Sequence, residues 1–296
     1  VEPREIRLLR RGARLAERRD ADAAQQREQL QEDFGGDERV AGRCLGARGV
    51  QAVQRNLQRA LVTRGCVTAR VLVPEQNIAS GVLRLQIVPG RVAGIADEGE
   101  RSGLVATVLP TRGNALLNQR DIDQAIENLR RLPSQRTEID IRPGDNLGES
   151  QLLFKHNSDK RWRFSSSLDN AGSKATGRVG ASFTLNVDSP LHLYDQLTLT
   201  HNRNAQSSDE SGNRGTSLSW NVPVGYWSIS AGANRYEYLQ TIAGFSGPIR
   251  YTGNSRGADL GLGWVARRDA SSKTSLAAKL SQRQSQNSSG MTMIPP

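Results

Sequence analysis

The second half of the chain alternates apolar and polar residues over segments that are long for ordinary strands. In residues 178–187 (RVGASFTLNV) every second residue is apolar and the residues between them are small or polar. A period of two predicts a β-strand with one apolar face and one polar face. The pattern recurs in about seven segments of roughly 9–16 residues, whereas ordinary strands have about 5–6. Such lengths are typical of tilted strands that cross a membrane.

The connections between these segments alternate in length. Longer polar stretches (DNAGSKATG, NRNAQSSDESGNRG and LQTIAGFSGPIRYTGNSR) follow the first, third and fifth strands, and shorter ones (DSPLHLY, PVG and RDASS) follow the others. Outer-membrane β-barrels have short periplasmic turns and long external loops. Trp220, Tyr226 and Trp227 bracket the tightest turn, as an aromatic girdle would. A soluble β-sandwich is the alternative, but it does not explain the strand lengths or the loop asymmetry. We therefore predict an antiparallel transmembrane sheet over residues 158–296.

The region before this sheet contains one helix-and-hairpin pattern twice. Residues 50–63 place Val50, Val53, Leu57 and Leu61 at helical spacing, and two short alternating strands follow. The same order recurs from Asn118 onward, at a period of about 70 residues. We predict two tandem α+β modules, at 41–92 and 93–157, in which a helix covers one face of a small sheet.

Residues 1–40 are predicted to form a polar helix and a linker, because Arg, Glu, Gln and Ala dominate and apolar residues are few. The chain begins with Val1 and shows no signal-peptide pattern, so we expect that a targeting segment was removed or that the chain is a fragment. Cys44 and Cys66 flank the predicted helix 50–63, which would be about 22 Å long. That separation argues against a bridge between them, since bridged Cα atoms approach within about 7 Å.

The charge leaves a few classes of function open. A net charge of +10 is compatible with nucleic acid, an anionic membrane surface or a polar cavity. Aromatic residues are only 5% and no nucleic-acid-binding motif is present, so nucleic-acid binding is the weaker alternative. His156, His192 and His201 lack metal-ligand spacing, and GFSG at 244–247 is not a nucleophile elbow. We expect no catalytic, metal or cofactor site.

Several short motifs, taken in order, resemble one family. They are GRCLG at 42–46, the RG-VT-R-LPEQ-like stretch within 64–92, NQRDIDQAIENLRRLPS at 118–134, LDNAGSKATGR at 168–178, YDQLTLT at 194–200, VPVGYWSISAGANRYEY at 222–238 and RRDASSKTSL at 267–276. The chain resembles the two-partner secretion transporters, the haemolysin secretion/activation family of outer-membrane proteins. The resemblance implies two periplasmic POTRA modules, a large antiparallel barrel and export of an unfolded haemolysin or adhesin without ATP.

The sequence departs from that family in three respects. We expect the first module to lack the strand and helix with which it opens in the family, and with them the strand that would carry a cysteine partner for Cys44. Position 66 is Cys where the family usually has Tyr. The family barrel has sixteen strands, and about seven are counted here. We therefore expect a truncated transporter, with a non-functional fragment as the alternative reading.

The resemblance also implies two partners, a secreted protein in extended form and outer-membrane lipid. We expect the extended protein to add as a strand to an exposed edge of the first module, because main-chain hydrogen bonds give affinity with little demand on sequence. The predicted edge is Val82, Leu83, Arg84, Leu85, Gln86, Ile87 and Val88. The polar N-terminal helix is expected to occupy the lumen of the barrel.

Overall fold

A computed structural model describes residues 4–8, 46–78, 82–99, 103–173, 176–206, 211–245, 247–290 and 292–294. The chain divides into two compact units, one comprising residues 1–94, 113–119 and 141–151 and the other comprising 95–112, 120–140 and 152–296. Among the described residues, no helix is both long enough and apolar enough to cross a membrane.

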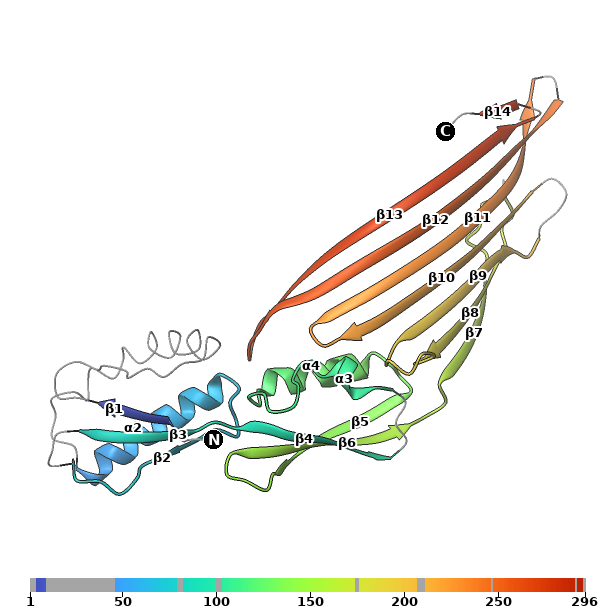
Figure 1. Ribbon diagram of the computed structural model, residues 1–296. Coiled ribbons are helices and arrows are strands. Elements are labelled where there is room, and N and C mark those ends of the chain that lie inside the picture. Colours follow the sequence, from blue (N-terminus) through green and yellow to red (C-terminus); the bar gives the residue numbers. More distant parts are fainter. Residues whose placement is uncertain are drawn as a thin grey trace. The chain divides into compact units, whose positions relative to one another are not determined.

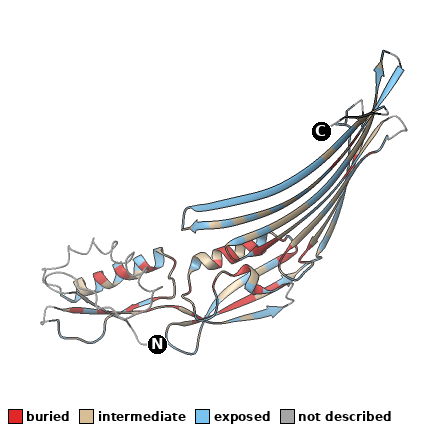
Figure 2. Ribbon diagram, turned by 45° about the horizontal axis from the view of Figure 1, so that its top comes forward, coloured by how far each residue is buried: buried red, intermediate tan, exposed pale blue. Residues whose placement is uncertain are grey.

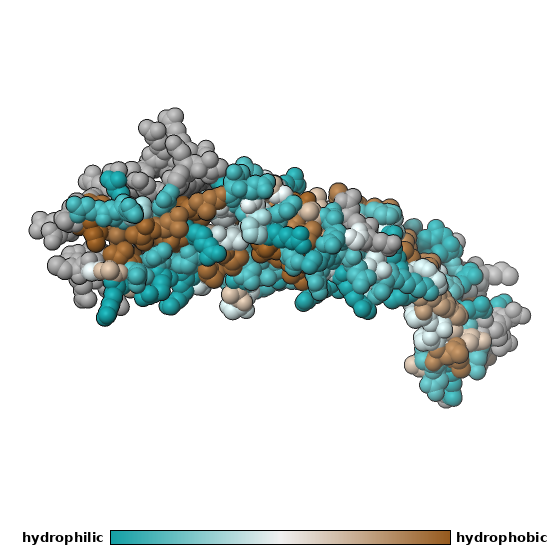
Figure 3. Space-filling view, turned by 90° about the horizontal axis from the view of Figure 1, so that it is seen from below, coloured by the Kyte–Doolittle hydropathy of each residue, from teal (hydrophilic) through white to brown (hydrophobic). Residues whose placement is uncertain are grey.

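The first module is a small antiparallel sheet with one helix. Its elements are β1 (Arg4–Leu8), α2 (Ala47–Thr63), β2 (Arg70–Leu72) and β3 (Leu83–Val88), and the strand order is β1-β3-β2. The predicted helical stripe is buried through Val53, Leu57 and Leu61, which join Ala69, Val71, Leu83 and Leu85 in one core. Figure 3 shows hydrophobic surface gathered over this module at the left of the view. The helix stops where predicted, because Gly65 has φ +90.

The prediction that this module lacks an opening strand is wrong. Residues Arg4 to Leu8 pair with β3 in the register Arg4↔Ile87 to Leu8↔Leu83, so they belong to the sheet and not to a polar helix and linker. The composition concealed this strand, since Arg, Glu and Leu are good helix formers and tertiary pairing overrides propensity. The rest of the predicted N-terminal helix, its proposed place in the lumen, and Cys44 lie outside the described residues.

The second helix-and-sheet pattern contains β4 (Arg91–Gly99), α3 (Val105–Val108), α4 (Gln119–Arg130), β5 (Gln135–Pro143) and β6 (Glu149–Ser158). Its sheet has the order β4-β6-β5. Ile122, Ala125 and Leu129 of α4 are buried, as the helical spacing predicted. The sequence analysis did not anticipate β4 or α3.

The large sheet begins at residue 162. Its strands are β7 (Trp162–Asp169), β8 (Gly180–Asp188), β9 (Gln196–Asn204), β10 (Gly212–Val224), β11 (Trp227–Gly244), β12 (Gly247–Arg268), β13 (Lys273–Ser289) and the short β14 (Thr292–Ile294). Each strand pairs antiparallel with the next, in chain order (Figure 1). The predicted antiparallel arrangement of about seven long strands is confirmed.

One predicted loop is wrong. The sequence predicts a long connection from Leu239 to Arg256, but β11 extends to Gly244 and β12 begins at Gly247. Their pairing runs without a break from Trp227↔Trp264 to Gly244↔Gly247. The glycines and polar residues of this stretch resemble a loop in composition, but cross-strand pairing satisfies the backbone and extends both strands.

Candidate functional site

The large sheet has one continuous apolar face. Cross-strand partners connect a row of seven apolar side chains through seven successive strands, namely Trp162, Val187, Leu197, Trp220, Ala231, Leu260 and Leu280. The next row consists of Phe164, Leu185, Leu199, Leu218, Ala233, Ala258 and Gln282. Many of these side chains are open to the surroundings, and Leu260 is 61% and Leu280 75% exposed. Figure 2 shows the contrast between the buried faces of the helices and the mostly exposed long strands.

The opposite face of the same strands is polar. The row one residue away from the first apolar row consists of Arg163, Asn186, Thr198, Ser219, Gly232, Asp259 and Ser281. Glycines on this face leave room for neighbouring polar groups, since a Cβ at Gly261 would lie 2.4 Å from Ser230 Oγ. An extended apolar face that nothing in the described chain covers is stable only beside an apolar solvent, while the polar face requires water.

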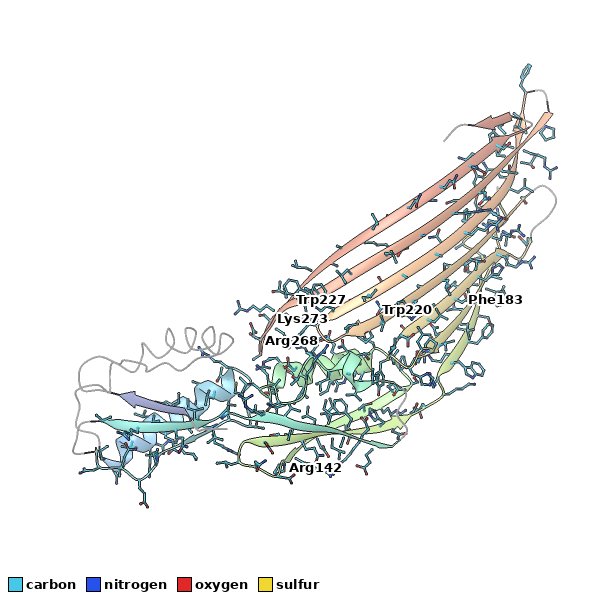
Figure 4. All side chains as sticks on the ribbon, viewed as in Figure 1. Arg142, Phe183, Trp220, Trp227, Arg268 and Lys273 are labelled. Atoms are coloured by element: carbon cyan, nitrogen blue, oxygen red, sulfur yellow. The ribbon has the colours of Figure 1, made fainter. Side chains whose placement is uncertain are left out.

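Aromatic side chains gather at one end of the apolar face, where the short turns lie. Trp227 and Trp264 are cross-strand partners, and their rings stack with centroids 5.3 Å apart. Lys160 Nζ lies 3.4 Å above the ring of Trp162. Trp220 donates from Nε1 to Asp195 at 2.7 Å. Amphipathic rings with a polar neighbour are typical of the boundary between hydrocarbon and water. Figure 4 labels Trp227 and Trp220 at this end of the sheet, and Phe183 farther along β8.

The turn between β10 and β11 is held by α3 and α4. Gly225 donates from its backbone N–H to Thr107 O at 2.7 Å, and its carbonyl accepts from Asn128 Nδ2 at 2.9 Å. Asn128, which is 5% exposed, donates from the same nitrogen to Val108 O at 2.9 Å. Gly225 has φ +60, which glycine adopts without strain. A single buried amide therefore joins the helix to the turn.

Tyr226, in the same turn, binds α4 and does not act as the girdle residue that the sequence suggested. Its hydroxyl donates to Asp121 Oδ1 at 2.5 Å, and Asp121 also accepts from Thr111 Oγ1. Burial, together with this hydrogen bond to a carboxylate, raises the pKa of Tyr226 above its ordinary value. The phenol is therefore a hydrogen-bond donor at every physiological pH.

The turn between β12 and β13 contacts the same helix through charge. Arg268 donates to Glu127 Oε2 at 2.6 Å and to Gln124 Oε1 at 2.8 Å, and Lys273 pairs with the other oxygen of Glu127. Partial burial opposes ionisation of Glu127, but the hydrogen bonds from Lys273 and Arg268 outweigh it and lower its pKa. Figure 4 shows Arg268 and Lys273 together near α4.

The third short turn, between β8 and β9, also contacts this segment. Leu104 donates from its backbone N–H to His192 O at 2.8 Å, and Thr107 Oγ1 donates to Leu193 O at 3.0 Å. All three short turns of the described sheet are therefore hydrogen-bonded to α3 or α4 or to the residue that precedes α3. We call these contacts the turn latch.

The predicted edge strand lies inside its sheet. Leu83 to Val88 form strand β3, as predicted, but β3 pairs with β1 on one side and with β2 on the other. The prediction that Val82 to Val88 form an exposed edge is wrong because Arg4–Leu8 occupies that position. Leu83 and Leu85 are buried, at 5% and 2% exposed, as their apolar spacing indicates.

Two glutamine side chains cover the outer edge of β2. Gln58 Nε2 donates to Ala69 O at 2.8 Å, and its Oε1 accepts from the N–H of Val71 at 3.0 Å. Gln54 Nε2 donates to Val71 O at 2.8 Å. The amide of Gln58 thus pairs with the strand as a neighbouring peptide would. These contacts satisfy the edge groups that an added strand would need.

The residues of the turn latch lie in the motifs NQRDIDQAIENLRRLPS, PVGYW and RRDASSK, but the sequence does not predict that these motifs meet. No short-range signal connects Asp121 to Tyr226 or Glu127 to Arg268, because each pair is more than a hundred positions apart in the chain. No local sequence signal marked Asn128, whose burial against the turn appears only in the structure.

Comparison with known proteins identifies relatives over most of the chain. A family model described as haemolysin secretion/activation protein ShlB/FhaC/HecB matches residues 148–294. A ShlB-type POTRA domain model matches residues 38–90, and a second POTRA domain model matches residues 91–143.

Individual relatives agree. The chain is 34% identical over 245 residues to the outer membrane transporter CdiB-2 of Burkholderia pseudomallei, covering 82% of this chain and 42% of that protein. It is 28% identical over 246 residues to the haemolysin transporter protein ShlB of Serratia marcescens, covering 82% and 43%. The solved structure of CdiB from Acinetobacter baumannii superposes with a TM-score of 0.81 at 29% identity, covering 95% of this chain and 54% of that one. The chain thus spans less than half the length of these two curated relatives.

Proposed function

Because the chain belongs to the haemolysin secretion/activation family (ShlB/FhaC/HecB), we propose that it supplies two POTRA modules and seven wall strands of an outer-membrane transporter in two-partner secretion. The observation that carries this proposal is the pair of matched rows, one apolar and one polar, on opposite faces of the same seven strands. The apolar face would meet lipid, and the polar face would line a water-filled path for a haemolysin- or adhesin-class partner. The POTRA modules would lie in the periplasm.

The polar face suits passage of an unfolded chain. Its rows are rich in Ser, Thr, Asn and Gly, so they offer hydrogen bonds but no apolar surface on which an extended protein would adhere. Transport would then need no catalytic group, and we propose that the chain is not an enzyme and needs no cofactor. Enzymatic turnover abolished by a single side-chain change would contradict this.

Labelling of cysteines on the two faces tests the placement in the membrane. In the full chain with Cys44 and Cys66 replaced by Ser, we expect a membrane-impermeant maleimide to label Ser230→Cys on the polar face but not Leu260→Cys on the apolar face. The two positions lie on adjacent paired strands. Equal labelling of both cysteines in the outer membrane would refute the proposed orientation of the sheet.

We further propose that the partner adds as a strand to β5. Of the strands from β2 to β6, β3 is paired on both sides and β2 is covered by Gln54 and Gln58. The start of β4 is hydrogen-bonded to residues 114–117, through Val92 N–H to Ala115 O at 3.0 Å. Within the described residues β5 pairs with β6 alone, so it is an edge strand of its sheet. An open edge is the template that strand addition requires.

Site-specific crosslinking tests this edge. We expect a photoreactive residue at Glu138, exposed on β5, to crosslink to the N-terminal region of the secreted partner during export. The matched control is Leu147, which is 79% exposed in the adjoining turn and lies off the edge. Equal yield from both positions would indicate random encounter and would contradict strand addition at β5.

A further inference from the structure

Beyond the apolar rows, the same face of the sheet carries a cluster of arginines. On strands β9 to β12, Arg203, Arg214, Arg235 and Arg256 follow the apolar residues at even spacing, so they share the face of Leu199, Leu218, Ala233 and Ala258. We call these four residues the arginine belt. They lie toward the end of the sheet opposite the turn latch (upper right in Figure 1).

Among the described residues, the four arginines of the belt have one carboxylate bound to them. Arg203 and Arg214 are direct cross-strand partners, and so are Arg235 and Arg256. Like charges directly opposite each other destabilise a sheet. Glu237 pairs with Arg214 at 2.5 Å and with Arg235, and it is the one acidic side chain that the described structure shows bound to the belt. An anion bound between two such paired cations would relieve their mutual repulsion.

The position of the belt relative to the apolar rows indicates the depth at which such an anion would bind. Arg235 lies two residues after Ala233 on β11, and its partner Arg256 lies two residues before Ala258 on β12, so both arginines stand about 7 Å farther along the strands than the alanines. The guanidinium groups therefore begin where the apolar face ends, at the depth of lipid headgroups. The side chains of Arg214 and Arg235 are 69% and 55% exposed, so they are accessible from the lipid side.

We propose that the arginine belt binds the phosphate groups of a phosphorylated glycolipid in the external leaflet. Guanidinium groups bind phosphate in a bidentate, charge-assisted manner. The lipid phosphate supplies negative charge between the paired arginines, while its acyl chains lie on the apolar rows below. This inference rests on the proposed membrane placement of the sheet.

Lipid retention tests the belt in the full chain. The protein is reconstituted in phosphatidylcholine nanodiscs containing bisphosphorylated lipid A, and bound lipid A is counted by native mass spectrometry after detergent extraction. We expect Arg235→Gln/Arg256→Gln to lower retention about tenfold or more. The matched control, Lys279→Gln/Arg283→Gln, removes two cations from the polar face of β13 and should change retention less than about twofold.

Two further measurements use the wild-type protein. Wild-type protein should retain lipid A from which both phosphates have been removed about tenfold less well, and millimolar inorganic phosphate should not displace the intact lipid. The lipid site is refuted if the inserted protein retains both lipids equally, if both double variants lose lipid A equally, or if free phosphate displaces lipid A. The proposal that the sheet spans the membrane would survive these results. Failure of the chain to insert at all would overturn both proposals.

Discussion

Replacing Leu218 with arginine tests whether the apolar face contacts lipid or water. Leu218 lies on β10, between β9 and β11, and is 43% exposed in the described chain. It is six residues from Val224, which pairs with Trp227 at the aromatic end. At about 3.4 Å per residue this is about 20 Å along the strand, and a tilt of about 40° reduces it to about 15 Å of depth. Since the apolar band of such barrels is about 25 Å tall, Leu218 lies near its middle.

At that depth an arginine costs about 2–4 kcal/mol. We expect Leu218→Arg to lower the free energy of unfolding by this amount in phosphatidylcholine vesicles, measured by urea titration with tryptophan fluorescence. The control is Ser219→Arg, one residue along the same strand and on the polar face, where neighbouring Thr198 and Gly232 are small. It should change the free energy by less than about 0.5 kcal/mol.

A soluble sheet would give a different result. A side chain that is already exposed to water tolerates arginine, so Leu218→Arg and Ser219→Arg would then have equal and small effects. That outcome in vesicles would refute the assignment of the apolar rows to lipid, and with it the orientation on which the arginine belt depends.

Further predictions concern the turn latch. Asn128→Ala should destabilise the protein by about 3 kcal/mol, because it leaves the carbonyls of Val108 and Gly225 without this buried donor, whereas the exposed Asn146→Ala should cost under about 0.5 kcal/mol in the same urea titration. An equal effect of the two would show that the helix contact carries no stability. Glu127→Gln should cost under about 1 kcal/mol at pH 7, since Glu127 is 42% exposed. The pKa of Glu127 is lowered from 4.5 in the folded state, so its contribution is present above pH 4.5 and is lost as the pH falls through the lower folded value. Denaturation midpoints of wild type and variant should therefore converge in acid, and a constant gap would contradict this ion-pair account.

The turn latch gives α4 a mechanical role within its own unit. Its contacts combine a buried amide, a phenol-carboxylate hydrogen bond and a double ion pair, and they hold successive turns of the sheet in fixed positions relative to one another. Since these turns join the wall strands in pairs, a change in the helix would move several strands at once.

The sequence predicted those elements whose signal is local and periodic. Alternation over residues 178–187 identified a membrane strand without any knowledge of its neighbours, and the spacing of Val53, Leu57 and Leu61 identified the buried stripe of α2. Both patterns depend only on which environment each face of one element meets. Composition misled where a strand is rich in helix formers, as in Arg4–Leu8, or rich in glycine and polar residues, as in Leu239 to Arg256.

The amino-acid sequence alone therefore determined that the C-terminal half of the chain forms strands with one apolar and one polar face, and that helix-and-sheet modules precede them. The reason is that side-chain periodicity is a local property of each segment. Only the tertiary structure decided which strand edges are open, which turns α4 binds and which arginines stand side by side. Those properties arise from pairing between segments that are distant in the chain. The free energy of such a pair depends on the register of the two strands and on the distance between their side chains, and neither segment alone specifies these.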